Sequence, residues 1–456
     1  MKTRRFIILA IDIVAAVACS KEVSPVENSS SKEYSFSAYM QTPTKTSLDK
    51  DEQGALTKMI WDAGDKIGLF DAKGVPQPFT TEKGGEKAVF KGEADAPESV
   101  WFAFYPYSAS ATKAGNPGSE NLRTIIPEVQ YAVKDNIPKN VSVLVAKCDV
   151  GNTVLNFTHV CGYIRINVPE GVVSVTIETE GTPLSGSVAG PYNTETTPWA
   201  TRFRHNSVTL VSPDGGPMSE GTYYMAVLPV KHTGKVLLSM RRNDGKISVK
   251  EATELSVGRA KVRPINITPV WMEDDGVSLY TEDSAKNKCA VSAANSKVTE
   301  VDDVKILGSK STKWEIETKN QGYFKVVGVN SARFDVSSYT EGYALEYYIK
   351  AEPPTRGTSW ELYCHNFAGK WIDNSNQGKA TDKTIVYGTA MANDTFFGIE
   401  DTAWHRISVP FDESLVNGIN KEFLSVELKL YKESIDGNVF YIDDVRIVRK
   451  KATVAQ

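Results

Sequence analysis

The sequence predicts an all-β protein, and three observations lead to this class. Apolar and polar residues alternate with a period of two through much of the chain; in residues 163–168, Ile164, Ile166 and Val168 share one face. No helical period continues for more than about three turns. Clusters of Gly, Pro, Asn and Asp separate the short apolar runs, as in β-sandwiches and barrels, and Asp244-Gly245 marks one hairpin turn.

Length and composition indicate the number of domains and argue against three classes of protein: nucleic-acid-binding, disordered and disulfide-dense. At about 100–200 residues per domain, 456 residues predict about three domains. The 52 Lys+Arg against 56 Asp+Glu leave a net charge of −4, so the chain lacks the basic excess of a nucleic-acid-binding protein, and we expect no such partner. A hydrophobic content of 41% argues against a disordered chain, and five cysteines are too few for a disulfide-dense scaffold.

Residues 1–18 have the features of a lipoprotein signal peptide. A basic start precedes an apolar run at residues 6–18, which is shorter than the about 20 residues that span a bilayer. Cys19 directly follows small residues, as in a bacterial lipobox, where the cysteine is lipidated. Asp12, inside the apolar run, departs from the pattern, and a plain secretory signal peptide is the alternative.

The remainder divides at composition breaks. The segment after Cys19 is rich in Ser and Glu and has no aromatic residue, which predicts a flexible tether. Polar residues near 148–153 and an acidic, turn-rich stretch near 268–276 suggest two further boundaries. We therefore expect a tether at residues 19–33 and folded units at 34–150, 151–272 and 273–450.

The four other cysteines are not expected to bind metal. Cys148, Cys161, Cys289 and Cys364 have no C-x-x-C spacing, so a cysteine-type zinc site is not predicted. Cys161 and Cys364 lie in alternating apolar runs, where a buried free thiol is the default. A Cys148–Cys161 bridge is left open as the alternative.

Several conspicuous residues are assigned to the fold. Gly64-Asp65 predicts a tight turn that brings Trp61 against the strand after it. Trp314 and Trp404 lie within strand-like patterns and are expected in the core. His159 stands alone between apolar residues and is interpreted as a hydrogen-bonded structural histidine, not a ligand or base.

A series of short segments resembles, in order, the fimbrillin family of bacterial surface and fimbrial proteins. These segments are residues 45–48, 61–70, 101–107, 126–130, 154–159, 183–186, 223–229 and 258–267. The resemblance implies two tandem transthyretin-like β-sandwiches, exported as a lipoprotein to the outer membrane. It also implies, for polymerising members, removal of an N-terminal strand by an arginine-specific protease and assembly by strand donation.

The chain departs from the polymerising pattern in two ways. No arginine occurs between Arg5 and Arg123, so the early strand lacks an arginine cleavage point, and a large extra unit follows the closing strand. Both departures favour a terminal adhesin or an anchored protein over a repeating shaft subunit.

The C-terminal unit is similar to jelly-roll β-sandwiches of the carbohydrate-binding-module or galactose-binding-like type. The similarity is carried by residues 334–339, 343–349, 404–410 and 440–447. It implies a jelly-roll β-sandwich after the two transthyretin-like units, a sugar-binding role, and a structural calcium ion that joins the first strand to the last.

Sugar binding needs aromatic faces for stacking and fixed polar groups for the hydroxyls. Alternation places Tyr363 and His365 on one strand face. The polar loop that follows contains Trp371 together with Asn374 and Asn376. We take these five residues as the candidate carbohydrate site, with Trp371 as stacking platform; in the alternative, Trp371 folds back to cover the end of the sandwich.

A calcium site would need hard oxygen ligands. Asp443 or Asp444, together with Glu282 or Asp283 near the start of the unit, could supply them. A solvated acidic turn without metal is the alternative. Calcium is the only cofactor that we consider.

We expect no enzymatic activity, because no nucleophile elbow, HExxH motif, phosphate loop or dinucleotide fingerprint occurs. A pair of acids for glycoside hydrolysis depends on a separation set by the fold, so that alternative stays open. The hypothesis is a surface-exposed, outer-membrane-anchored lipoprotein adhesin whose C-terminal unit binds a glycan or a host or bacterial surface protein. The alternatives are an accessory or tip subunit that assembles with fimbrial subunits, and a glycan-capture protein for polysaccharide uptake.

Overall fold

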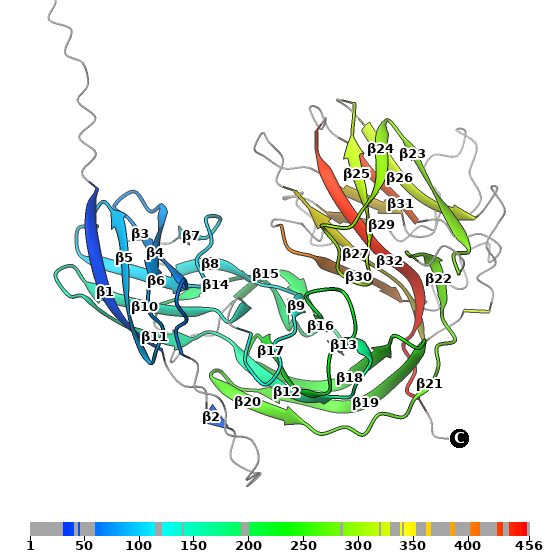
Figure 1. Ribbon diagram of the computed structural model, residues 1–456, viewed down its shortest axis with the longest axis horizontal. Helices are drawn as coiled ribbons and strands as arrows, with labels where there is room; N and C mark the ends of the chain where they lie inside the picture. Colours follow the sequence, from blue (N-terminus) through cyan, green and yellow to red (C-terminus); the bar gives the residue numbers. More distant parts are fainter. Residues whose placement is uncertain are drawn as a thin grey trace, which may run out of the picture.

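The computed structural model of the chain consists of β-strands (Figure 1). Every named element, from β1 to β32, is a strand, so the all-β prediction is confirmed. No helix among the described residues is long and apolar enough to cross a membrane. The structure describes residues 31–40, 44–45, 60–114, 121–138, 141–192, 200–282, 286–318, 321–328, 338–339, 342–352, 362–365, 384–387, 402–410, 426–431 and 437–453.

The first seven-stranded sheet closes on itself as a barrel. Its strands, in spatial order, are β1 (Lys32–Met40), β11 (Val154–His159), β10 (Leu144–Asp149), β6 (Val100–Tyr105), β3 (Lys66–Phe70), β4 (Pro76–Thr81) and β5 (Lys87–Ala94). The first strand closes it, parallel to β11 and antiparallel to β5. This closed arrangement differs from the open two-layer sandwich that the resemblance implies. β11 belongs to the barrel, whereas the predicted division at residue 151 assigns it to the next unit.

Aromatic side chains fill the barrel, with Trp61 at their centre. Its ring lies edge-on to Phe90, Tyr105 and Phe157, with centroids 4.9–5.4 Å apart. Its indole N–H donates to the carbonyl of Ala38 at 3.1 Å. Trp61 is completely buried, as a core role requires, and the three rings that it contacts come from β5, β6 and β11.

The second unit packs two sheets around an aliphatic core. One sheet contains β17 (Gly221–Val227), β12 (Gly162–Val168), β20 (Lys261–Ile265) and β2 (Thr44–Lys45). The other contains β21 (Met272–Glu273), β19 (Lys246–Val257), β18 (Val230–Arg242), β13 (Val172–Thr179), β16 (Ser207–Val211) and β9 (Val129–Tyr131). The predicted hairpin at Asp244-Gly245 is confirmed, since it joins β18 to β19 with Gly245 at φ 84°.

The barrel and the second unit exchange strands. The short strands β2 and β9, which precede residue 151, pair with β20 and β16 of the second unit. A further sheet also mixes the two parts, with β15 (Ala200–His205), β14 (Ser185–Pro191), β8 (Asn121–Ile126) and β7 (Thr112–Ala114) in this order. The predicted boundary at residue 151 therefore does not separate two independent sheets.

The C-terminal unit is a two-sheet β-sandwich around a core that includes Trp314, Phe324 and Phe440. One sheet contains β24 (Ser296–Val301), β25 (Ser311–Ile316), β32 (Val439–Arg449), β27 (Tyr343–Ala351) and β30 (His405–Pro410), with β22 (Val277–Tyr280) also paired to β32. The other contains β23 (Cys289–Ala294), β26 (Gln321–Gly328), β31 (Val426–Tyr431), β28 (Leu362–His365) and β29 (Thr384–Tyr387). The jelly-roll assignment of this sandwich stays a prediction.

A bulge in β32 changes which of its residues face the core. Ile442 and Val445 both lie in the core although they are three positions apart, which an uninterrupted strand does not allow. The pairing of β32 with β27 shifts by one residue between them, and Asp444 has a positive φ of 54°. An extra residue in one strand produces this change of parity. Both halves of β32 therefore present apolar side chains to the core.

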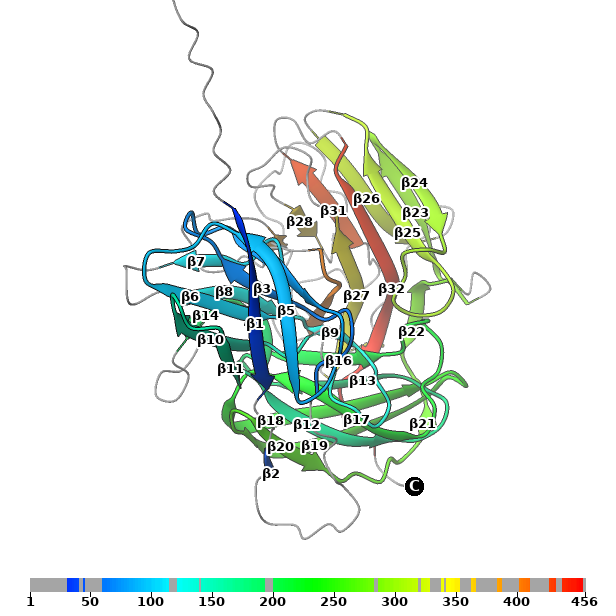
Figure 2. The same cartoon turned by 60° about the vertical axis from the view of Figure 1, so that its left-hand side comes forward.

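The β32-containing sheet packs against the second unit through the face that points away from the sandwich core. Tyr348 and Tyr441 of this sheet, and Trp404 just before β30, share a buried cluster with Val129 and Val211 of the second unit. In Figure 1 the C-terminal sandwich stands on the second unit, and β1 lies at the opposite end of the molecule. We call this sheet the docked sheet and the sheet that contains β28 the outer sheet; Figure 2 shows the same two sheets from another side.

Backbone groups also join the second unit to the sandwich. The N–H of Gly308 donates to the carbonyl of Gly215 at 2.8 Å. A Cβ atom on Gly215 would lie 2.4 Å from the Gly308 oxygen, and Gly215 has a φ of +77°. Near the C-terminus, the N–H of Thr453 donates to the carbonyl of Val249 at 2.8 Å. The two parts thus meet closely enough to fix their relative orientation.

Candidate functional site

The predicted carbohydrate residues lie only partly within the described structure. Tyr363 and His365 belong to β28, which pairs with β29 on one side and β31 on the other. Trp371, Asn374 and Asn376 lie outside the described residues. Whether the five residues form one site therefore stays a prediction. The contacts with the second unit described above come from the docked sheet, and β28 lies in the outer sheet.

Three of the predicted calcium ligands line one pocket. Glu282, Asp443 and Asp444 are all part of its wall, together with Lys310. Asp283 lies outside the described residues. The first strand and the last strand of the sandwich do meet here, as the resemblance implies, because β22 pairs with β32.

The contacts of these carboxylates are mostly with N–H donors. One oxygen of Asp443 accepts from the backbone N–H groups of Ile306 and Leu307 at 3.0 and 3.2 Å. One oxygen of Glu282 accepts from the Ser309 hydroxyl at 2.7 Å and from the Lys310 N–H at 3.2 Å. Each of these two oxygens already accepts two or more hydrogen bonds, which leaves it no lone pair for calcium. Calcium binding by this set stays a prediction.

Asp444 takes part in the contact between the units. Its carboxylate pairs with Arg446 of the same strand and with Arg241 of β18, the latter at 3.4 Å. Arg241 also pairs with Asp274 at 3.3 Å. Burial, followed by the neighbouring Asp444 charge, raises the pKa of Asp443 well above its usual range. Two guanidinium groups next to Asp444 do not favour a divalent cation at this carboxylate.

A larger charged network is buried where the docked sheet meets the second unit, and Arg406 is at its centre. Its guanidinium pairs with Glu178 of β13 at 3.0 Å and with Glu346 of β27. It also donates to the Ser207 hydroxyl at 3.1 Å. Lys450 pairs with Glu178 at 2.6 Å and with Glu346 at 2.5 Å. Two cations therefore neutralise two carboxylates from opposite sides of the contact.

The charges of this network hold its carboxylates ionised. Burial alone would raise the pKa of Glu346, but the charges of Arg406 and Lys450 outweigh it and keep the pKa well below its usual range. The pKa of Glu178 is lowered in the same way, by Lys450 and then Arg406 against the effect of burial. Since both folded pKa values are depressed, the stabilisation is fully present above the unfolded pKa of about 4.5 and is lost as the pH falls towards the folded values.

We therefore expect acid to weaken the contact between the units. Glu346→Gln is expected to lower the urea midpoint relative to wild type at pH 7. This difference should shrink steadily between pH 4.5 and pH 3, because Glu346 takes up a proton in the unfolded chain over this range while it stays ionised in the folded protein. Urea denaturation followed by fluorescence at pH 7, 5, 4 and 3 measures it. A difference that stays constant over this range would contradict the assignment.

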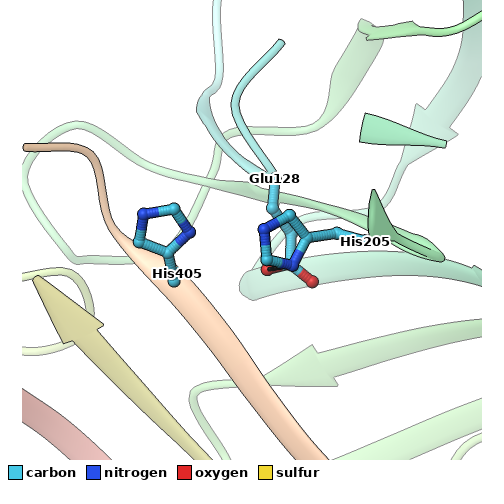
Figure 3. A group of neighbouring side chains, drawn as sticks. All are labelled: Glu128, His205 and His405. Carbon is cyan, nitrogen blue, oxygen red and sulfur yellow. Dashed lines mark ion pairs between the residues drawn. The ribbon is translucent and has the colours of Figure 1, made fainter. Parts of the chain in front are cut away.

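Three further polar side chains, Glu128, His205 and His405, meet beside this network (Figure 3). Glu128 lies between β8 and β9, His205 ends β15, and His405 begins β30. Nδ1 of His205 lies 3.2 Å from a Glu128 oxygen, and the same oxygen accepts the backbone N–H of Arg406 at 3.1 Å. The two imidazole rings are 5.3 Å apart.

Sequence reasoning missed both groups of residues. Residues 343–349 and 404–410 have the pattern of strands, and alternation assigns Glu346 and Arg406 to the face opposite the core. A charged outward face normally indicates solvent. The sequence gives one indication that this face is covered by protein: the large apolar residues Tyr348 and Trp404 lie on it, next to Glu346 and Arg406.

The other singled-out residues have structural roles. His159 is buried, with its Nδ1 2.5 Å from the Tyr163 hydroxyl, which confirms a hydrogen-bonded structural histidine. Trp314 is buried in the core of the C-terminal sandwich as expected, whereas Trp404 is buried in the cluster between this sandwich and the second unit. Cys148 and Cys161 are free buried thiols, so the alternative bridge between them is wrong. Burial raises the pKa of Cys148 to about 11 and that of Cys161 to about 12, so both are protonated.

The chain matches no protein-family model and no curated protein. Among solved structures, it is similar to two candidate cell adhesion proteins. The one from Bacteroides ovatus has 13% identity and a TM-score of 0.33, with 53% of this chain and 96% of the other covered. The one from Bacteroides uniformis has 14% identity and a TM-score of 0.29, with 53% and 98% covered.

A family 30 carbohydrate-binding module is also similar to this chain. It has 12% identity and a TM-score of 0.26, with 38% of this chain and 98% of the module covered. At these identities and TM-scores, the similarities to solved structures support no conclusion about the function of this protein.

Proposed function

We propose that this protein is a surface lipoprotein adhesin, anchored to the outer membrane through Cys19, that presents its C-terminal sandwich to a glycan or a surface protein. One observation carries the proposal: the two sheets of the sandwich have different surroundings. The docked sheet is covered by the second unit and bound to it by buried ion pairs. The outer sheet contains β28, with the candidate residues Tyr363 and His365.

The position of the first strand supports this arrangement. β1 begins at Lys32, within the last two residues of the predicted tether, and lies at the end of the molecule opposite the C-terminal sandwich (Figure 1). An anchor before β1 would therefore hold the sandwich away from the membrane. The ion pairs and backbone contacts with the second unit would keep its orientation constant, which favours presentation of one surface.

A glycan array tests the binding half of the proposal. The full-length protein should bind a defined group of glycans, and Trp371→Ala should weaken that binding at least tenfold because the stacking surface is lost. Trp271→Ala, which removes an equally large half-buried side chain from the second unit, is the matched control and should bind like wild type. Equal binding by wild type and Trp371→Ala, or no glycan bound at all, would reject this site.

Cell fractionation with Cys19→Ala tests the anchoring half. The variant should leave the outer membrane and appear in soluble fractions, whereas wild type should remain in the membrane and be accessible to added protease.

Immunogold label on filaments would instead favour the accessory fimbrial subunit. The pairing of β1 on both sides, with β5 and β11, argues against its removal for strand donation.

A further inference from the structure

Glu128, His205 and His405 have the composition and proximity of a metal-ligand set. One ligand atom from each of the three lies within 4.8 Å of the other two. Figure 3 shows the three side chains converging from three separate segments. All three are buried, with 3%, 8% and 5% of their surface exposed.

The donor types match a transition metal. Imidazole nitrogens and a carboxylate oxygen form common three-ligand sets for Zn²⁺, in which a water or another ligand completes a tetrahedron. Ligand atoms around tetrahedral zinc are about 3.4 Å apart, given bonds of roughly 2.1 Å. The His205 nitrogen and the Glu128 oxygen are already 3.2 Å apart, and a His405 nitrogen, within 4.8 Å of both, would have to move closer to complete the set.

Neighbouring groups hold the carboxylate in place, as outer groups around metal sites do. The Ser207 hydroxyl donates to one oxygen of Glu128, and the backbone N–H of Arg406 donates to the other. Ser207 is itself bonded to the Arg406 guanidinium at 3.1 Å. Glu128 is therefore oriented before any ion arrives.

The charge balance also favours a cation here. The carboxylates of Glu128, Glu178 and Glu346 lie in or beside the network, against the two positive charges of Arg406 and Lys450. With neutral histidines, the group carries one uncompensated negative charge, and burying such a charge costs free energy. A divalent ion next to Glu128 removes this excess.

We propose that Glu128, His205 and His405 bind a divalent transition-metal ion, with zinc as the best match, and that the ion fastens the C-terminal sandwich to the rest of the protein. His405 comes from the sandwich, His205 from the second unit, and Glu128 from the segment that links the barrel to the second unit. An ion held by all three stabilises the assembled state because it binds only when the parts are together.

Zinc binding by the full-length protein tests the proposal. After treatment with a chelator, the protein is titrated with Zn²⁺ against a chromogenic competitor, and thermal unfolding is followed with and without zinc. We expect one zinc ion per chain and a higher melting temperature with zinc. His205→Ala and His405→Ala should each lower the affinity at least tenfold and remove the thermal shift. If wild type binds no zinc, the proposal is overturned. The negative charge of Glu128 would then be balanced by a protonated His205.

A matched control separates this site from general histidine binding. His232 is equally buried, but its Nδ1 lies 2.7 Å from the Thr182 hydroxyl and it is not one of the three clustered residues. His232→Ala should therefore bind zinc like wild type; equal losses in all three histidine variants would contradict the assignment.

Cobalt provides a readout that does not depend on stability. Co²⁺ at this site should give visible absorption of a four- or five-coordinate ion without the near-ultraviolet band of a thiolate ligand, since no cysteine is in the set. Glu128→Gln keeps the size of the side chain and one of its two acceptor oxygens, so it covers the case in which a histidine variant fails to fold. An unchanged cobalt spectrum in Glu128→Gln would overturn the role of this residue.

Discussion

Arg406→Met is expected to lower the free energy of unfolding by about 3–5 kcal/mol, because it leaves buried carboxylates without their partner. The guanidinium is 3% exposed and pairs with Glu178 across the contact and with Glu346 within the docked sheet. Lys450 alone cannot neutralise both. We expect the loss mainly at the contact, so limited proteolysis should release the C-terminal sandwich before the barrel is degraded.

Urea denaturation and proteolysis of wild type and Arg406→Met measure this effect. Arg263→Met is the matched control, since Arg263 is an exposed residue of β20, and it should change stability by less than about 0.5 kcal/mol. The double variant Arg406→Met/Glu346→Leu should recover part of the loss, because removing both partners avoids the buried unpaired charge. A single variant as stable as wild type would show that the network does not hold the units together.

Trp61→Ala is expected to destabilise the barrel by about 3–5 kcal/mol, as is typical when a buried tryptophan is truncated. The substitution removes edge-on contacts with Phe90, Tyr105 and Phe157 and leaves the carbonyl of Ala38 without its indole donor. Neighbouring rings attached to the closed barrel cannot collapse far into the space, so the cavity persists.

Thermal unfolding of Trp61→Ala and Trp61→Phe distinguishes packing from hydrogen bonding. Trp61→Phe retains part of the ring contacts and should lose less stability than Trp61→Ala. Trp271→Ala serves as control, since Trp271 is half-buried and stacks on Arg242 at the edge of the second unit, and its loss should be smaller. Equal effects of Trp61→Ala and Trp271→Ala would contradict a central role for Trp61.

The strands could be predicted from local pattern, whereas their partners could not. Residues 163–168 alternate strictly and form β12, and Asp244-Gly245 forms the turn after β18, because alternation and turn chemistry act within a few residues. The pairing of β9 with β16, by contrast, depends on register between distant segments. Alternation indicates which face is apolar, but it does not name the strand that lies beside it.

The buried clusters were unpredictable for a related reason. Glu128, His205 and His405 are far apart in sequence, and each on its own is typical of a surface residue or a lone core residue. They become a set only when the C-terminal sandwich packs on the second unit. The proximity of Glu282 to Asp443 and Asp444, by contrast, could be predicted. The resemblance to jelly-roll sandwiches implies that the first and last strands of the domain lie side by side, and β22 does pair with β32.

The exchange of strands between the barrel and the second unit determines the order in which the chain can fold. Ser37, near the start of the chain, pairs with Val154, so the barrel closes only after β11 has emerged. By then β8 and β9 present edges that are completed by β14 and β16. Until those strands arrive, the early part of the chain exposes unpaired edges that invite association with other chains. Productive folding of this half of the protein is therefore a single late event, completed only when β14 and β16 have paired with β8 and β9.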